Sequence, residues 1–297
     1  MTRRLFLTLA ALAQITLAAG AVSGQAPPAT QRLNVTWLPS SPRVGDVAVL
    51  SVQGPAAGAS VDGVVAGRPV TFFRDARGYA ALVGFDLELR AEYEAWAVTV
   101  REPDRPLRHV RGRVRVRGRE FPVQRLTLPG GMVDLDPETE RRALAEAAVL
   151  QTLYRTITPE RLWRGSFLRP IGGEEPGSGF GARRIINNQP RAPHTGIDYA
   201  APRGTPVVSV NDGRVALVAE YFFPGRLVAV DHGLGLYTLY FHLDEVRVEV
   251  GQRVARGQPV GSVGSTGRAT GPHLHFGVHL GGARVDPDRL LSLPALD

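Results

Sequence analysis

The sequence predicts a mainly β protein, in which a short helical connector joins an N-terminal immunoglobulin-like β-sandwich to a second, antiparallel β-domain. The 297 residues include 34 glycines and 23 prolines, and this level favours strands joined by turns over long helices. Short alternating apolar runs fill both ends of the chain, and one segment with helical spacing lies between them. Apolar residues at 43% and charged residues at 21% are typical of a globular protein.

The first residues have the pattern of an export signal. Arg3 and Arg4 precede an apolar run that ends near Ala19, where a small-residue cleavage pattern follows. We expect a signal peptide over residues 1–26 and a linker over 27–33. An uncleaved anchor is the alternative, although the run is short for a span of about 20 apolar residues. The mature protein is expected to have no transmembrane span and to act in the periplasm, the cell envelope or outside the cell. DNA is not an expected partner, despite the net charge of +7.

Residues 34–130 read as the β-sandwich. Apolar runs at 47–52, 70–73 and 95–100 have the length of strands, and glycine or proline separates them. Short strands at this spacing are typical of a sandwich. No catalytic constellation is visible in this part of the sequence.

One predicted strand of the sandwich is unusually basic. Five arginines recur at every second position and so share one face of an extended strand: Arg111, Arg113, Arg115, Arg117 and Arg119. They can form the solvated face of an edge strand, where charge prevents aggregation. The other interpretation is a binding stripe for anionic polymers of the cell envelope.

The connector, residues 131–170, begins with a helix. Asp136 and Pro137 supply an N-cap and a proline at the first helical position. The expected buried face holds five residues at helical spacing: Leu144, Ala147, Ala148, Gln151 and Tyr154. A second start signal at Thr158 predicts a shorter helix near Trp163.

Residues 171–297 form the second β-domain. After a glycine-rich loop at 172–181, strand-like runs occur at 207–210, 227–230, 237–240 and 273–280. The chain has no cysteine and no lysine. Any metal ion here must therefore be held by imidazole and carboxylate groups.

Five residues of this domain carry the chemistry. His194 and Asp198 share a face of an extended segment, as do His273 and His275, and His242 ends an alternating run. A catalytic zinc ion takes three nitrogen or oxygen ligands and keeps an open position. Proton transfer then needs a further imidazole or carboxylate nearby. Spacing alone does not say which of His273 and His275 would bind the metal.

The same segments resemble a known family. HTGID, YFHL and HLH occur in the order H-x-x-x-D, Y-x-H-L and H-x-H, within text such as GIDYAAPRGTPV and STGRATGPHLHFGV. Residues 194–287 resemble the lysostaphin/LytM family of zinc endopeptidases, which cleave peptide bonds in bacterial cell-wall cross-links. The resemblance implies a zinc metallopeptidase domain over residues 171–297, acting on peptide cross-links of peptidoglycan.

The resemblance also implies roles for the five residues. His194, Asp198 and His275 would bind Zn²⁺, and His242 and His273 would handle protons. His232 is expected to be structural or to lie at the rim of the groove, and His279 is not expected to be a ligand. The alternative is a catalytically silent member that binds cell wall or activates an amidase. Biotinyl and lipoyl carrier domains share the hairpin pattern at 246–264, but they require a lysine.

Overall fold

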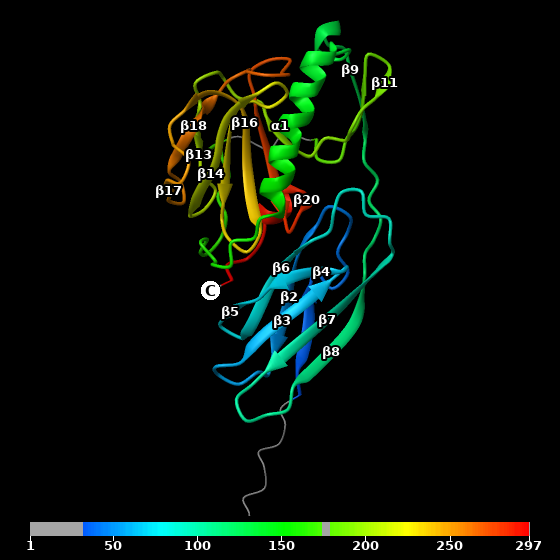
Figure 1. Ribbon diagram of the computed structural model, residues 1–297, viewed down its shortest axis with the longest axis vertical. Helices are drawn as coiled ribbons and strands as arrows, with labels where there is room; N and C mark the ends of the chain where they lie inside the picture. The colour runs from blue at the N-terminus through cyan, green and yellow to red at the C-terminus, as the bar shows by residue number, and fades with distance from the viewer. Residues whose placement is uncertain (1–31, 174–178, 297) are drawn as a thin grey trace, which may run out of the picture. The chain divides into compact units, whose positions relative to one another are not determined.

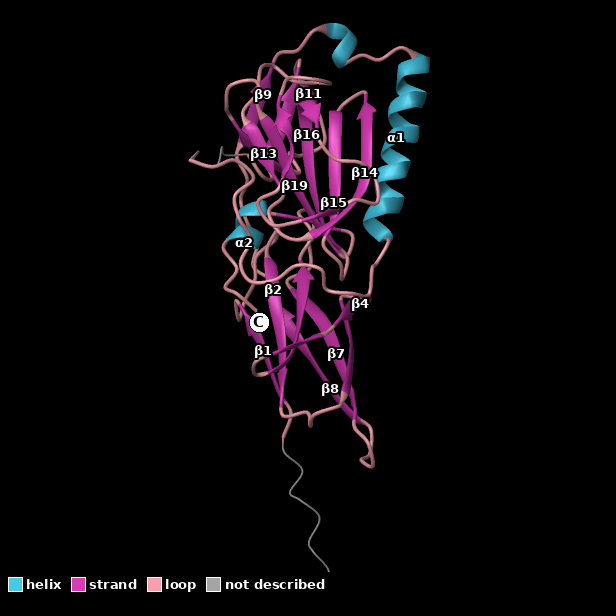
Figure 2. Ribbon diagram, turned by 90° about the vertical axis from the view of Figure 1, so that its left-hand side faces the viewer, coloured by secondary structure: helices cyan, strands magenta, loops and turns pink. Residues whose placement is uncertain are grey.

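The computed structural model describes residues 32–173 and 179–296. The predicted signal peptide, most of the predicted linker and the middle of the glycine-rich loop lie outside the described residues. The described chain is mainly β, as the sequence predicts (Figures 1 and 2). Neither of its α-helices combines the length and the apolar character that a bilayer span requires.

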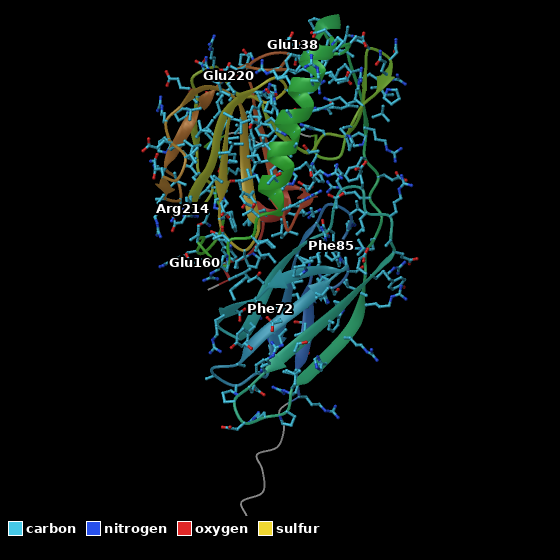
Figure 3. The ribbon with its side chains drawn as sticks, viewed as in Figure 1. Phe72, Phe85, Glu138, Glu160, Arg214 and Glu220 are labelled. Atoms are coloured by element: carbon cyan, nitrogen blue, oxygen red, sulfur yellow. The ribbon has the colours of Figure 1, made fainter. Side chains whose placement is uncertain are left out.

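The N-terminal part consists of two four-stranded antiparallel sheets. One has the order β1-β2-β6-β5 and the other β4-β3-β7-β8. The strands are β1 (Asn34–Leu38), β2 (Val47–Gln53), β3 (Ser60–Val65), β4 (Arg68–Thr71), β5 (Phe73–Asp75), β6 (Gly78–Gly84), β7 (Tyr93–Arg101) and β8 (Arg108–Arg115). Apolar side chains from both sheets form one core, which includes Phe85 and against which the partly buried Phe72 packs (Figure 3). The two sheets therefore form a sandwich; its immunoglobulin-like character stays a prediction.

Strand β2 is buried on both of its faces. Ala48 and Leu50 belong to the core of the sandwich, whereas Val47 and Val49 belong to the core of the C-terminal domain. A near-continuous apolar run is typical of a strand covered on both sides. The sandwich thus packs its β2–β6 sheet against the C-terminal domain.

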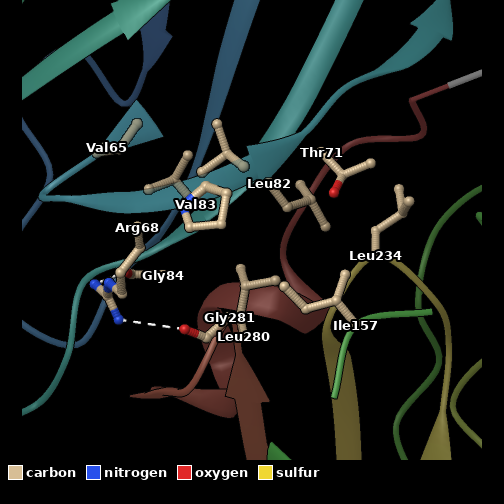
Figure 4. A pocket seen from close by; sticks show the side chains of 12 residues that line it. Val65, Arg68, Thr71, Leu82, Val83, Gly84, Ile157, Leu234, Leu280 and Gly281 are labelled. Atoms are coloured by element: carbon tan, nitrogen blue, oxygen red, sulfur yellow. Dashed lines mark hydrogen bonds between the residues drawn. The ribbon is translucent and has the colours of Figure 1, made fainter. Parts of the chain in front are cut away.

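Polar contacts reinforce this packing. The guanidinium of Arg284 donates two hydrogen bonds to the carboxylate of Asp86, at 3.1 and 2.7 Å, and one to Glu88 at 2.7 Å. Beside them, a narrow pocket with mostly apolar walls lies between strands β4 and β6 and the turn at Gly281 (Figure 4). Arg68 closes one side of it by donating to the carbonyl oxygens of Gly84 and Gly281, at 3.3 and 3.4 Å. These contacts fix the base of the domain that carries the histidines.

The basic strand β8 lies at a sheet edge, next to β7. The predicted stripe is shorter than expected, because Arg119 turns away and forms an ion pair with Asp286 at 2.6 Å. Arg117 lies beyond the end of β8 but remains exposed. Arg111, Arg113 and Arg115 are exposed on the strand itself.

The predicted helix is α1 (Pro137–Arg155). The Asp136 side chain caps it by accepting hydrogen bonds from the amides of Glu138 and Thr139, at 2.9 and 3.0 Å. The predicted buried face is wrong except for Tyr154, since Leu144 is 65% exposed. Leu150, Leu153 and Tyr154 pack instead on the C-terminal sheet.

Glu146 explains the error in the predicted face. It lies on the inner side of α1, where a polar residue was not expected. Its carboxylate accepts from Arg142 at 2.7 Å and from the amide of Phe222 at 2.7 Å. A polar group with partners is tolerated at a packed surface, so the apolar pattern alone gave a face rotated by one residue.

The second predicted helix is wrong, because residues 156–170 contain no helix. The amides of Leu162 and Leu168 donate to the carbonyl oxygens of His232 and Val210, each at 2.9 Å. Trp163 is buried in the C-terminal core. These contacts hold the segment in an irregular form, and they outweigh the local helix signal.

The C-terminal domain is built on a nine-stranded antiparallel sheet with the main order β12-β19-β16-β15-β14-β17. The strands of this sheet are β12 (Gly196–Tyr199), β13 (Pro206–Val208), β14 (Gly213–Tyr221), β15 (Gly225–Asp231), β16 (Leu236–Val246), β17 (Arg253–Val254), β18 (Pro259–Val263), β19 (Leu274–Leu280) and β20 (Ala283–Val285). The short helix α2 (Pro287–Leu291) follows it. The strands predicted from the four apolar runs are therefore confirmed.

A smaller sheet joins the end of the predicted sandwich segment to the C-terminal part of the chain. Strand β9 (Val123–Leu126) pairs in parallel with β10 (Arg183–Ile186), which pairs with β11 (Gln189–Pro190). The 3₁₀-helix η1 (Gly130–Met132) follows β9. Residues 123–126, which the sequence places in the sandwich, thus pair with the C-terminal part of the chain.

Candidate metal and catalytic centre

Three predicted residues converge where β12 meets β19. The antiparallel register places Asp198 directly opposite His275, and His194 lies just before β12. Their potential ligand atoms all lie within 4.8 Å of one another. Gly196 allows this approach, because a Cβ atom there would lie 2.7 Å from Nε2 of His275.

The three side chains share short polar contacts. The Oδ1 atom of Asp198 lies 3.0 Å from Nε2 of His194 and 2.9 Å from Nδ1 of His275. The two ring nitrogens are 2.8 Å apart. Two nitrogens and one oxygen that face a common point fit the donor set of a catalytic zinc ion, which leaves a further position open.

The ionisation of these groups also suits a metal ion, which needs neutral imidazole and ionised carboxylate. Burial lowers the pKa of His275 to about 4, although the hydrogen bond to Asp198 opposes this shift. Burial alone would raise the pKa of Asp198. The hydrogen bonds from His194 and His275 outweigh it and hold that pKa well below its usual range.

His242 and His273 lie beside this cluster, with ring centroids 4.7 Å apart. Nδ1 of His242 lies 2.8 Å from the carbonyl oxygen of Thr266, and Nδ1 of His273 lies 2.8 Å from that of Gly271. A carbonyl oxygen only accepts, so each Nδ1 atom carries the proton. Each Nε2 atom then keeps a lone pair that can accept a proton.

The backbone at His242 is unusual. Its φ of 62° is in the left-handed region, and β16 shifts register against β15 between Tyr240 and Leu243 and against β18 between Leu243 and Glu245. Its amide donates to the carbonyl oxygen of Pro224 at 2.8 Å instead of continuing the ladder. Irregular pairing of this kind re-aims a side chain, and it is common next to active sites.

Two further histidines play other parts. His232 is fully buried, and its ring nitrogens contact the carbonyl oxygen of Asp212 at 2.7 Å and the hydroxyl of Thr238 at 2.8 Å. His279 stacks on Tyr154 of α1 with ring centroids 3.6 Å apart. Both are packing residues, and the burial of His232 agrees with its expected structural role.

The stability of the metal-free protein should fall as the pH falls from 7.5 to 4.5. Burial lowers the pKa of His279 to about 3. Between this value and about 6.5, the unfolded chain binds a proton that the folded chain does not. His279→Phe keeps the stacked ring and removes this titration. It should therefore reduce the loss of unfolding free energy over this range by roughly 2 kcal/mol, measured by urea denaturation. An unchanged pH dependence would contradict this account.

Part of the surroundings of the site could not be predicted from the sequence. A pocket that contains Asp198, His242, His273 and His275 is also lined by residues of the smaller sheet and of the loop before β19. These include Gln124, Leu126, Leu128, Arg184, Ile186, Arg268 and Thr270. Arg184 lies 3.6 Å from Oδ2 of Asp198. The sequence carried no local signal for the neighbours from β9 and β10, because these strands are far apart along the chain.

The five residues of the site lie in a region that matches a known family. Residues 192–287 match the model of Peptidase family M23. The chain is 43% identical over 138 residues to peptidoglycan DD-endopeptidase ShyA of Vibrio cholerae, covering 46% of this chain and 30% of that protein. It is 46% identical over 94 residues to DD-carboxypeptidase/endopeptidase Mpg of Neisseria meningitidis, covering 32% of this chain and 22% of that protein.

The chain therefore spans less than a third of the length of these two relatives. A solved structure matches far more of it. A Pseudomonas aeruginosa protein, whose crystal structure is described as that of a peptidase M23, is 32% identical to it. That match has a TM-score of 0.66 and covers 84% of this chain and 95% of that chain. The family model matches the C-terminal part of this chain, and the Pseudomonas aeruginosa protein is aligned with it over 95% of that protein's chain. The chain therefore belongs to peptidase family M23.

Proposed function

We propose that this protein is a zinc-dependent endopeptidase that hydrolyses peptide bonds in bacterial peptidoglycan. The observation that carries the proposal is the convergence of His194, Asp198 and His275 beside two histidines with free Nε2 atoms. The names of the relatives, peptidoglycan DD-endopeptidase and DD-carboxypeptidase/endopeptidase, support the substrate class.

In this proposal, His194, Asp198 and His275 hold the zinc ion. Zinc supplies a Lewis acid that polarises a carbonyl group and makes water more acidic. His242 and His273 accept the proton of the attacking water at Nε2 and return it to the leaving amine. Thr266 and Gly271 orient these two rings through their carbonyl oxygens.

Hydrolysis by the wild type is the first test. Purified peptidoglycan incubated with the full chain should release new amino groups, detected with an amine-reactive reagent. Chelation should stop this release, and added zinc should restore it. A wild type that binds zinc but releases no amino groups from any cell wall tested would favour the silent scaffold instead.

We also propose that the protein acts in the cell envelope, where peptidoglycan lies. The exposed arginines Arg111, Arg113 and Arg115 on the edge strand β8 offer a site for its anionic polymers. Arg115 contacts Glu92 at 3.2 Å, and Arg113 lies over the Tyr93 ring at 5.0 Å. These contacts leave a smaller basic surface than five aligned arginines would give, so we assign it an accessory role.

A further inference from the structure

The pocket beside the catalytic centre has a positively charged wall. Arg184 projects into it from β10, and Arg268 projects from the loop between β18 and β19. Both line the same pocket as Asp198, His242 and His273. A substrate group that enters this pocket would therefore meet two guanidinium groups next to the reacting atoms.

The pocket lacks enough negative charge to balance these arginines. Asp198 is the single carboxylate among the described residues that line it. That carboxylate is already shared by His194 and His275, with Arg184 3.6 Å away. A bound divalent cation would add still more positive charge. An anion from outside the protein would remove this imbalance.

Of the two arginines, Arg268 has the weaker partners, whereas Arg184 lies near a carboxylate. Its guanidinium lies 4.1 Å from the centre of the Phe223 ring and donates a long hydrogen bond of 3.5 Å to the carbonyl oxygen of Met132. Burial, together with the nearby charges of Arg184 and Arg191, lowers the pKa of Arg268 to about 10. The fold thus holds Arg268 in place at an electrostatic cost, and neither the ring nor the carbonyl group carries a charge that would neutralise it.

The chemistry of the pocket indicates which anion fits. A guanidinium group is a planar fork whose parallel N–H groups match the two oxygens of a carboxylate. The other walls of the pocket include the apolar side chains of Leu126, Leu128 and Ile186. This combination suits a small aliphatic amino acid that carries a free carboxylate.

We propose that Arg268, supported by Arg184, forms a subsite that binds a carboxylate of the peptide substrate next to the bond that is cleaved. The inference rests on the proposed peptidase function and specifies part of its substrate. It makes Arg268 a specificity-determining residue, which binds the anionic part of the peptide while the histidines act on the amide. The carboxylate can come from the peptide's C-terminus or from an acidic side chain.

A pair of charge-matched substrates tests this subsite. The probes are soluble cross-linked peptides released from peptidoglycan, in native form and with their carboxylates converted to carboxamides. For the full-length wild type, we expect kcat/KM to be at least about tenfold lower on the amidated form. Arg268→Gln should lose about 10- to 100-fold on the native form and change little on the amidated form. Peptides amidated only at the C-terminus or only at side chains then identify the carboxylate.

Arg268 is the better target of the two arginines, since Arg184 also contacts the proposed ligand Asp198. Arg268→Lys keeps the charge but not the fork, so its loss should be intermediate. Arg214→Gln is the matched control. Arg214 is an exposed arginine near the start of β14, whereas Glu220 lies near the other end of this strand (Figure 3). Zinc content and thermal unfolding show whether each variant is folded.

The outcomes separate the two proposals. Equal wild-type cleavage of native and amidated peptides, or an equal loss on both with Arg268→Gln, would overturn the subsite and leave the peptidase function standing. Cleavage of neither form by the zinc-loaded wild type would overturn the peptidase function and the subsite with it.

Discussion

Replacing Asp198 with asparagine should abolish metal binding and hydrolysis together. Asp198 offers its Oδ1 atom to both His194 and His275, at 3.0 and 2.9 Å. Asparagine has nearly the same shape but lacks the negative charge. In the variant, Arg184, which lies 3.6 Å from the wild-type carboxylate, would lose its anionic partner. Its positive charge would then repel a divalent cation. We expect zinc affinity to fall by more than about 100-fold, because even residues that only support a ligand cost about 10- to 100-fold.

The measurement is zinc content after dialysis, together with a competition titration against a chelator. Asp244→Asn is a suitable control, since Asp244 pairs with Arg203 at the surface, on the same strand as His242. The control should bind zinc as the wild type does. Stoichiometric zinc with unchanged affinity in Asp198→Asn would refute the proposed ligand set, whatever the activity.

The sequence was a good guide to the site because the key spacings are local. On an extended strand, residues two or four apart share a face, so His194 and Asp198 were expected to converge without knowledge of the fold. The structure brings the five predicted residues together on this basis. Their division into ligands and proton carriers came from the family resemblance, and it stays a proposal until the variants are measured.

What the sequence could not supply depends on contacts between distant segments. The parallel pairing of β9 with β10 joins residues 123–126 to 183–186. Nothing near either segment indicates this pairing, so the wall of the pocket was missed. The surroundings of Arg268 were missed for the same reason. The double burial of β2 was not predicted either, because its second face packs against residues that are distant in the sequence.

The second large effect concerns His242. We expect His242→Asn to lower kcat by about 10²- to 10⁴-fold, the usual contribution of a positioned general base. Burial, together with the neighbouring His275 and His273, lowers the pKa of His242 to about 3. The ring is therefore neutral at pH 7, with its Nε2 lone pair available. Asparagine tolerates the φ of 62° at this position better than most residues, which limits damage to the fold.

This variant separates an enzyme from a silent scaffold, because His242 is not one of the three proposed zinc ligands. His242→Asn should retain stoichiometric zinc and a melting temperature close to that of the wild type, while amino-group release from peptidoglycan almost disappears. A scaffold that only binds cell wall would be indifferent to this change in every assay. If His242→Asn kept full hydrolytic activity, the proton would have to pass through His273 alone, whose Nε2 lies 3.9 Å from Oδ1 of Asp198. In that case, His273→Asn alone should abolish the hydrolytic activity.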